Sequence, residues 1–174
     1  MTATVRQPTN LSLLNTNKWQ LSFIRVPNFV WFLQSVNLPG MSMNEVFRAT
    51  PFVDTMVPGD KTQYDVLNFN FLIDEDMRSW FEIHDWIRGM TFPEKFGEYK
   101  NLLAKNKNTG GQYSDATLTI TNNANLPNVR VKLIGCFPTM LGSLEFDQTQ
   151  DASQTMVGSA SFRFSYYTVE RFTT

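Results

Sequence analysis

Cysteine is nearly absent from this sequence, because Cys136 is the only one among 174 residues. A lone thiol without a CxxC spacing excludes an internal disulfide, a redox pair and a zinc site made of paired cysteines. We therefore expect the chain to fold in a reducing cytoplasm. Cys136 lies among apolar residues just before Phe137-Pro138, and a reactive thiolate would need a basic neighbour. We interpret it as a small buried hydrophobic side chain.

Charged residues are also scarce, and neither sign dominates. They make up 18% of the chain, and the formal net charge is -1, whereas about a quarter is usual for a globular domain. The charges are spread along the sequence, so no patch can neutralise a run of phosphates, and tight nucleic-acid binding is not expected. Aromatic residues reach 14%. This apolar excess over polar cover indicates a surface for a partner.

Long hydrophobic runs are missing as well. No stretch of about 18 apolar residues could span a membrane, and the first residues lack the basic and apolar regions of a signal peptide. We expect neither membrane insertion nor export by that route. Residues 1–17 are rich in Thr, Asn and Ser, with a small cluster at Leu11, Leu13 and Leu14. They are predicted to form an N-terminal arm, and residues 18–174 a single domain.

Side chains that could carry catalysis are few. The one histidine, His84, lies on the apolar stripe of a predicted helix, where a partly buried ring is the ordinary interpretation. The acidic run 74–76 precedes the same helix and is explained by capping and by the helix dipole rather than by a cation. Gly110-Gly111 lacks the flanking strand, helix and Gly-Lys-Ser/Thr of a nucleotide loop. We expect no catalytic, metal or cofactor site, and no enzyme.

A basic and aromatic stretch lies in the connector at residues 91–111. Basic side chains interleaved with aromatic rings can form a platform for single-stranded nucleic acid. Here the residues concerned are Tyr99, Lys100, Lys105, Lys107 and Tyr113. We interpret them as part of a solvated connecting loop.

Alternation with a period of two predicts the strands. Residues 19–24 form one strand, and residues 29–36 form another that is apolar on both faces; we expect the two to pair as a hairpin around Pro27. Residues 64–73 give the clearest strand, followed by a helix over residues 74–89.

The second half of the chain continues this pattern. Residues 116–121 and 129–133 predict a second hairpin, and Pro138 predicts a bend or a sheet edge within residues 135–142. Residues 162–167 predict a final strand. The total is seven or eight strands with one helix.

The segment from residue 41 to 60 has a weaker pattern. It is divided by Pro51, Pro58 and the turn at residues 58–60, yet it is too apolar for a simple solvated loop. We interpret it as an extended excursion of the chain.

Several segments, taken in chain order, carry a resemblance to a known family. They are Asn37-Leu38-Pro39-Gly40, Val57-Pro58-Gly59-Asp60-Lys61, the strand at 65–73 with Asp74-Glu75-Asp76 and a Trp-bearing helix after it, residues 137–147, and the FRFSYY run at 162–167. In this order they resemble the tail tube proteins of contractile-tailed bacteriophages and of related injection machines. The similarity spans about residues 18 to 168.

This resemblance implies a mainly β (α+β) fold of two packed antiparallel sheets, a sandwich or partial barrel with one flanking α-helix. It implies that six subunits close a ring, that rings stack into the inner tube of the tail, and that DNA passes transiently through the bore. Expected partners are further copies of the chain, the tail sheath protein, the baseplate hub and the tape-measure protein. No cofactor is expected. The implied location is the virion tail, after assembly in the cytoplasm of the bacterial host.

The extended excursion supplies the interface candidates, which resemble the family's loop toward the adjacent ring. They are Phe47, Pro51, Phe52, Val53, Met56, Val57 and Lys61. Tube-initiating baseplate proteins, adaptor or terminator rings and the tubes of related secretion systems share the fold and stay as alternatives. Because the chain is compact, the repeated tube subunit is the first interpretation. A non-stacking binding module and a small enzyme using His84 are rivals from other classes.

Overall fold

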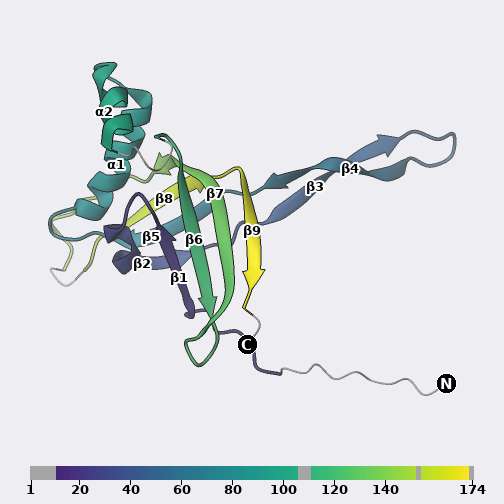
Figure 1. Cartoon of the computed structure of the whole chain (residues 1–174), viewed down its shortest axis with the longest axis horizontal. Helices are drawn as coiled ribbons and strands as arrows, with labels where there is room; N and C mark the ends of the chain where they lie inside the picture. The colour runs from purple at the N-terminus through teal and green to yellow at the C-terminus, as the bar shows by residue number, and fades with distance from the viewer. Residues whose placement is uncertain (1–10, 106–110, 152–153, 173–174) are drawn as a thin grey trace.

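The computed structural model describes residues 11–105, 111–151 and 154–172. These residues form nine strands, two α-helices and one 3-10 helix (Figure 1). In chain order they are β1 (Trp19–Phe23), η1 (Asn28–Phe32), β2 (Leu33–Val36), β3 (Met41–Arg48), β4 (Thr55–Tyr64), β5 (Leu67–Leu72), α1 (Arg78–Thr91), α2 (Gly97–Lys105), β6 (Ser114–Thr121), β7 (Pro127–Leu141), β8 (Val157–Arg163) and β9 (Tyr166–Arg171).

Two antiparallel sheets pack face to face and share strand β7. Sheet A has the order β1-β6-β7-β9, and sheet B has the order β7-β8-β5-β2. Residues 129–134 of β7 pair with β9, and residues 137–141 pair with β8. Gly135 has a φ of +69°, and the register shifts after Pro138, so the strand bends there from one sheet into the other. The bend predicted from Pro138 is therefore confirmed, although β7 continues through it between β6 and β8.

The inward faces of both sheets supply the core. Alternate residues are buried along β5, where Leu67, Phe69 and Phe71 are at most 2% exposed. The same period holds in β1, β6, β7 and β8, as expected when one face of each strand packs inside a sandwich. Five phenylalanine rings contact one another at its centre. They are Phe23, Phe29, Phe69, Phe71 and Phe162.

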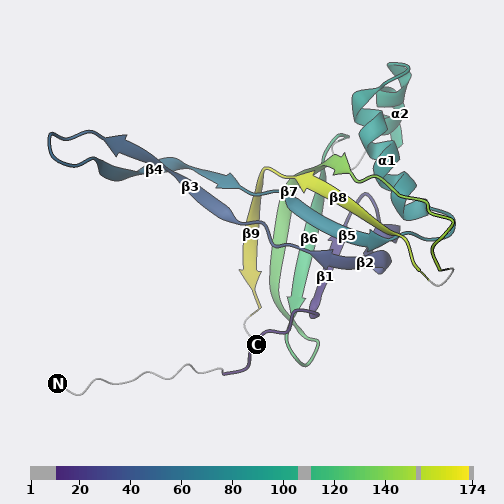
Figure 2. The ribbon, with the colours of Figure 1, turned by 180° about the vertical axis from the view of Figure 1, so that it is seen from behind.

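The two ends of the sandwich are closed differently. Helix α1 inserts Ile83 and Trp86 into the core, and the Trp86 ring lies 5.5 Å from that of Phe162. At the other end, Tyr64 at the base of β4 contacts Phe164 and Tyr167. The helices thus lie at one end, and the two-stranded ribbon of β3 and β4 projects from the other (Figures 1 and 2). Among the described residues, no helix is long and apolar enough to cross a membrane.

The first predicted hairpin is wrong. Strand β1 pairs with β6, and β2 pairs with β5, because η1 carries the chain from sheet A to sheet B instead of reversing it. The strand predicted over residues 29–36 begins only at Leu33, and Trp31 in the preceding helical turn is 84% exposed. An apolar run of this length fits a helical turn as well as a buried strand.

Helix boundaries and number also differ from the prediction. Helix α1 runs from Arg78 to Thr91 rather than over residues 74–89, and it ends where Phe92 takes a left-handed conformation. The connector predicted as a loop contains α2, so the sandwich has two flanking helices instead of one. Leu102 of α2 is buried against Gly89 of α1, and this tertiary contact holds a helix whose own sequence pattern is weak.

The β6–β7 hairpin is confirmed. The single final strand is wrong, because β8 ends at Arg163 in sheet B and β9 starts at Tyr166 in sheet A. Between them the Ser165 amide donates to the Ile134 carbonyl at 2.9 Å, where the chain crosses between sheets. The division into an arm and a domain stays a prediction, and residues 1–10 of the arm lie outside the described part of the chain.

Candidate assembly surface

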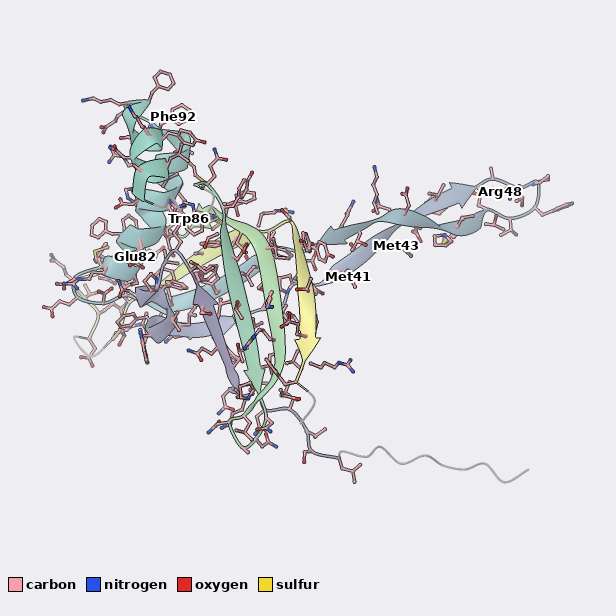
Figure 3. All side chains as sticks on the ribbon, viewed as in Figure 1. Met41, Met43, Arg48, Glu82, Trp86 and Phe92 are labelled. Atoms are coloured by element: carbon pink, nitrogen blue, oxygen red, sulfur yellow. The ribbon has the colours of Figure 1, made fainter. Side chains whose placement is uncertain are left out.

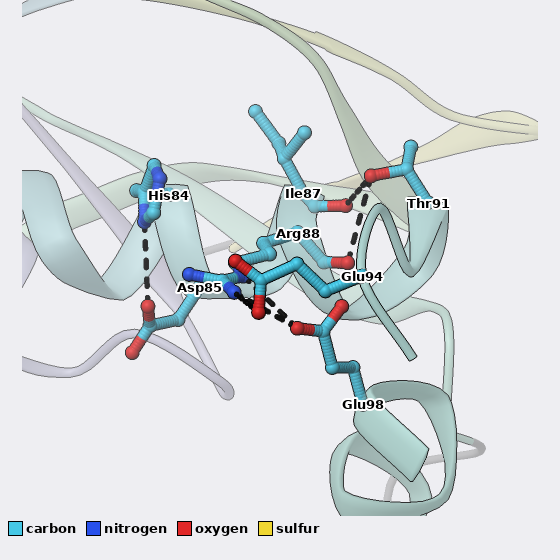
Figure 4. Close-up of polar contacts among 7 residues, drawn as sticks. All are labelled: His84, Asp85, Ile87, Arg88, Thr91, Glu94 and Glu98. Atoms are coloured by element: carbon cyan, nitrogen blue, oxygen red, sulfur yellow. Dashed lines mark hydrogen bonds and ion pairs between the residues drawn. The ribbon is translucent and has the colours of Figure 1, made fainter. Parts of the chain in front are cut away.

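The residues first considered for chemistry have structural roles. His84 is partly buried, as predicted, and its ring stacks on Trp80 with centroids 4.9 Å apart; its Nδ1 lies 3.4 Å from Asp85 (Figure 4). Among the described residues, no group of three or more His, Cys, Asp or Glu side chains could hold a metal ion. Cys136 is buried, and burial raises the pKa of its thiol to about 12, which disfavours the thiolate at neutral pH.

Asp74 is not the N-cap that the sequence predicted, because helix α1 begins at Arg78 with Met77 as its N-cap, and no acidic residue lies in its first turn. The Asp74 carboxylate accepts hydrogen bonds from the amides of Arg78 and Ser79, both at 3.2 Å, and from the Ser79 hydroxyl at 2.9 Å. Partial burial opposes ionisation, but these hydrogen bonds outweigh it and hold the pKa of Asp74 below its ordinary value. Helix α1 is therefore anchored at the point where it leaves sheet B.

The basic connector is only partly described. Lys107 and Gly110, and the side chain of Lys105, lie outside the described part of the chain. Tyr99 packs within α2, where its hydroxyl accepts a hydrogen bond from Gln112 at 2.6 Å. It is therefore engaged within the fold rather than presented as a stacking platform.

A charged cleft of about 540 Å³ lies alongside the contact between α1 and α2. Across it the Arg88 guanidinium donates to Glu98 from Nε at 3.2 Å and from Nη2 at 2.9 Å, and it pairs with Glu94 at 2.9 Å (Figure 4). Burial raises the pKa of Glu82 on the cleft wall. The pair between Arg88 and Glu98 joins α1 to α2. We therefore interpret the cleft as part of the packing between the two helices.

The seven interface candidates all lie on the ribbon, which we define as β3, β4 and the loop between them. Every residue of β3 is exposed, as is nearly all of β4. Figure 3 shows the ribbon extending beyond Met43 and Arg48 away from the sandwich. Phe52 in the loop is 96% exposed. A hairpin of two strands is marginally stable alone in water, so this ribbon is suited to being covered by a partner.

Apolar side chains occupy both faces of the ribbon tip. Phe47 lies opposite Met56, and the next pair along, Val46 opposite Val57, points to the other face. These four side chains are 62%, 65%, 57% and 44% exposed, respectively. A partner that covered only one face of the tip would leave the apolar pair on the other face exposed to water. The tip therefore fits between two neighbouring surfaces.

Lys61 does not belong to this tip. A register shift between Met43 and Glu45 separates the tip from the base of the ribbon, and Lys61 lies at that shift. Gly59 is required there, because a Cβ atom on it would lie 2.3 Å from the carbonyl oxygen of Asn44. The structure thus divides the candidates into a contiguous apolar tip and a separate lysine.

Three exposed apolar residues of the ribbon were missed as candidates. Met41, Met43 and Val46 are 57–64% exposed. The alternation of Met41 and Met43 with polar residues was available in the sequence, but an alternating strand is normally expected to bury its apolar side. Only the structure shows that the ribbon has left the sandwich.

A known protein resembles this chain in sequence. No family model matches the sequence. The tail tube terminator protein of Enterobacteria phage T4 is 27% identical over 149 residues, which cover 79% of this chain and 76% of that protein. This relative is a terminator rather than a repeated tube subunit. It therefore supports the terminating-ring alternative better than the first interpretation made from the sequence.

Solved structures agree on the fold. The tube-terminating cap of the anti-feeding prophage has a TM-score of 0.62 at 15% identity and covers 99% of this chain and 100% of its own. The sheath/tube terminator of the extracellular contractile injection system PVC gives 0.60 at 14%, covering 91% and 97%. A chain of the PVC sheath-tube complex gives 0.58 at 16%, covering 99% and 100%. The chain has the fold of these contractile-machine components.

Proposed function

We propose that this chain is a structural protein that closes into a ring and terminates the inner tube of a contractile phage tail or related injection machine. The observation that carries the proposal is its 27% identity over 149 residues to the T4 tail tube terminator protein. Likeness in fold to two other terminators, at TM-scores of 0.62 and 0.60, supports it.

The ribbon gives the proposal a physical basis. In a closed ring with head-to-tail contacts, each subunit has a neighbour on both sides. A ribbon with Phe47 and Met56 on one face and Val46 and Val57 on the other gains most from such two-sided cover. Its exposed apolar residues are poorly suited to a protein that works as a monomer.

The finer features follow as parts of the proposal. The ring is hexameric, lies in the virion tail and is assembled in the cytoplasm of the bacterial host. Its partners are further copies of the chain, the last tube ring, the sheath, and more remotely the hub and tape-measure protein, and DNA passes through its bore. It has no enzymatic role, so His84→Gln should leave assembly unchanged. A selective loss of a measurable turnover would contradict that part.

A second candidate is the repeated tube subunit, favoured by the likeness to a chain of the PVC sheath-tube complex over 99% of this chain. The two differ in whether assembly stops. A terminator forms rings of defined size and assembles no further as its concentration rises. A tube subunit instead stacks into tubes of growing length.

Native mass spectrometry and negative-stain microscopy of the purified chain over a concentration series test the proposal. We expect hexamers and isolated rings, without long tubes. Tubes of indefinite length would replace the terminator by the tube subunit. A monomer that persists at high concentration in every salt condition would refute both.

A further inference from the structure

Strand β9 is only partly covered by the rest of the fold. It is the last strand of sheet A, at the ribbon end of the sandwich (Figures 1 and 2). Directly opposed residues of antiparallel strands share one face of the sheet, so Val169, which pairs with Val131, belongs to the inward face. Val131 is 1% exposed, whereas Val169 is 53% exposed. Sheet B therefore does not extend over the second half of β9.

The first half of β9 shows the contrast. Tyr167 is partly buried, and its ring lies 5.1 Å from that of Tyr64 at the base of the ribbon. This contact ends before Val169. An apolar side chain left open along an unpaired strand edge is a place where a second chain can pack.

The open part of β9 carries a positive charge. We define the β9 edge as residues 168–172 together with Arg130 and Lys132 of the adjacent strand β7, which gives three cations and one carboxylate. Lys132 Nζ pairs with that carboxylate, Glu170, at 2.6 Å. Within the described part of the chain, the exposed Arg171 forms no ion pair. The β9 edge therefore suits a negatively charged partner.

A negatively charged surface lies at the other end of the same chain. We define the acidic end as residues 74–85, which hold five carboxylates and a single guanidinium, that of Arg78. This guanidinium pairs with Asp76 at 2.9 Å. Burial, and to a smaller extent the charge of Asp74, raises the pKa of Glu82, which shows that these carboxylates lie close enough to repel one another.

The two surfaces cannot meet within one subunit. The acidic end lies where the chain enters α1, at the helix end of the sandwich, and Glu82 lies far from the ribbon (Figure 3). The β9 edge lies at the ribbon end. A head-to-tail ring brings one side of each subunit against a different side of the next, and opposite charges across such a contact favour the correct partner. A second copy of this chain therefore offers the charge that each surface lacks.

We propose that, in the ring argued for above, the β9 edge of each subunit packs against the acidic end of the next subunit. This inference rests on the proposed ring. Phe81, which is 48% exposed within the acidic end, supplies apolar cover for Val169 and for Phe172. The ribbon leaves the sandwich at the same end as β9 (Figure 2), and so extends along the same neighbour.

Two charge-reversed variants test this contact. The edge variant, Thr168→Glu/Arg171→Glu, makes the β9 edge net negative and keeps the pair between Lys132 and Glu170. The end variant, Glu75→Lys/Asp76→Lys/Asp85→Lys, makes the acidic end net positive. All five substituted side chains are exposed. Each variant alone should need at least about a hundredfold higher subunit concentration to form rings, because like charges then face each other at every contact.

An equal mixture of the two variants gives the decisive result. Every contact between unlike variants places opposite charges together, so the mixture should form rings at the concentration where each variant alone does not. Only alternation satisfies every contact, and native mass spectrometry should show hexamers with equal numbers of the two variants. In 1 M sodium chloride, where the screening length falls to about 3 Å, this difference should disappear. As a matched control, Lys95→Glu/Lys100→Glu reverses two exposed cations outside both surfaces and should form rings like the unmodified chain.

The outcomes separate this inference from the proposed function. If the unmodified chain forms no ring, the proposed function fails. If it forms rings, and either variant alone forms them equally well, only the assigned contact is overturned. A mixture that stays dissociated also overturns it, because two surfaces that do not touch cannot restore each other. Should a multiple variant melt far below the unmodified chain, the single changes Arg171→Glu and Glu75→Lys are mixed and scored in the same way.

Discussion

Removing one apolar pair from the ribbon should weaken ring assembly without unfolding the subunit. In the double variant Phe47→Ala/Met56→Ala, the lost side chains are 62% and 65% exposed in the isolated chain. Full burial of such a side chain contributes about 1.5–3 kcal/mol. Since roughly two thirds of each is left for a neighbour to cover, assembly should lose about 1–2 kcal/mol per side chain and about 2–4 kcal/mol per subunit contact.

The assay is the subunit concentration at which rings dissociate, measured by native mass spectrometry and analytical ultracentrifugation. A loss of about 2–4 kcal/mol corresponds to association weaker by about 30-fold to several hundred-fold at each contact. The melting temperature of the dissociated subunit should change little, because the pair lies outside the core and a cross-strand pair contributes at most about 1 kcal/mol.

Two further variants make this result specific. Thr62→Ala alters the ribbon near its base without removing a large apolar side chain, and should leave dissociation unchanged. Val46→Ala/Val57→Ala removes the pair from the opposite face and should also weaken the ring, though less, because valine is smaller. Rings of Phe47→Ala/Met56→Ala that dissociate like the unmodified protein would refute the argument from apolar cover. An effect confined to one face would refute the two-sided contact.

Three predictions concern the subunit itself. Asp74→Ala should cost about 1 kcal/mol of unfolding free energy at neutral pH. Because the folded pKa of Asp74 is depressed, the difference from the unmodified protein, followed by chemical denaturation, should persist above the ordinary value near 3.8 and disappear as pH falls through the lower folded pKa. Gly89→Val should destabilise by about 1–3 kcal/mol through overpacking, since even a Cβ atom there would lie 2.7 Å from Leu102, and the melting temperature should fall by about 2–4 °C per kcal/mol. Gly89→Ala should be close to neutral, because alanine gains about 1 kcal/mol in helix propensity, and an equal loss in both variants would contradict the packing argument. Cys136 should not react with a thiol reagent at pH 8 until denaturant is added, and rapid reaction in the folded protein would contradict its burial.

Local pattern was sufficient for several features of this protein. The alternation in β5 places Leu67, Phe69 and Phe71 on the inward face, because a strand with one buried face cannot be stable with those residues in water. The acidic run indicated a helix start close by, and Asp74 accepts hydrogen bonds from the Arg78 and Ser79 amides, although the N-cap itself is Met77. The β6–β7 hairpin was predictable because its pairing is local.

Pairing between distant strands was decided only by the tertiary structure. Strand β1 pairs with β6, about a hundred residues away, rather than with its neighbour in sequence. An apolar run such as residues 29–33 suits a strand or a helical turn equally, and the closing of the sandwich end selects the turn. The docking of Leu102 on Gly89 likewise makes a helix of a segment that the sequence presents as a loop.

By itself, the sequence determined the mainly β character and the inward faces of the strands, because each depends on contacts between nearby residues. The tertiary structure alone decided that β3 and β4 form a ribbon with two apolar faces. It also decided which side chains share each outward face, by bringing Asn70 beside Ser159 and Lys132 beside Glu170. Such faces are made of side chains from strands far apart in the chain, and their composition is fixed only when strand order and register are fixed.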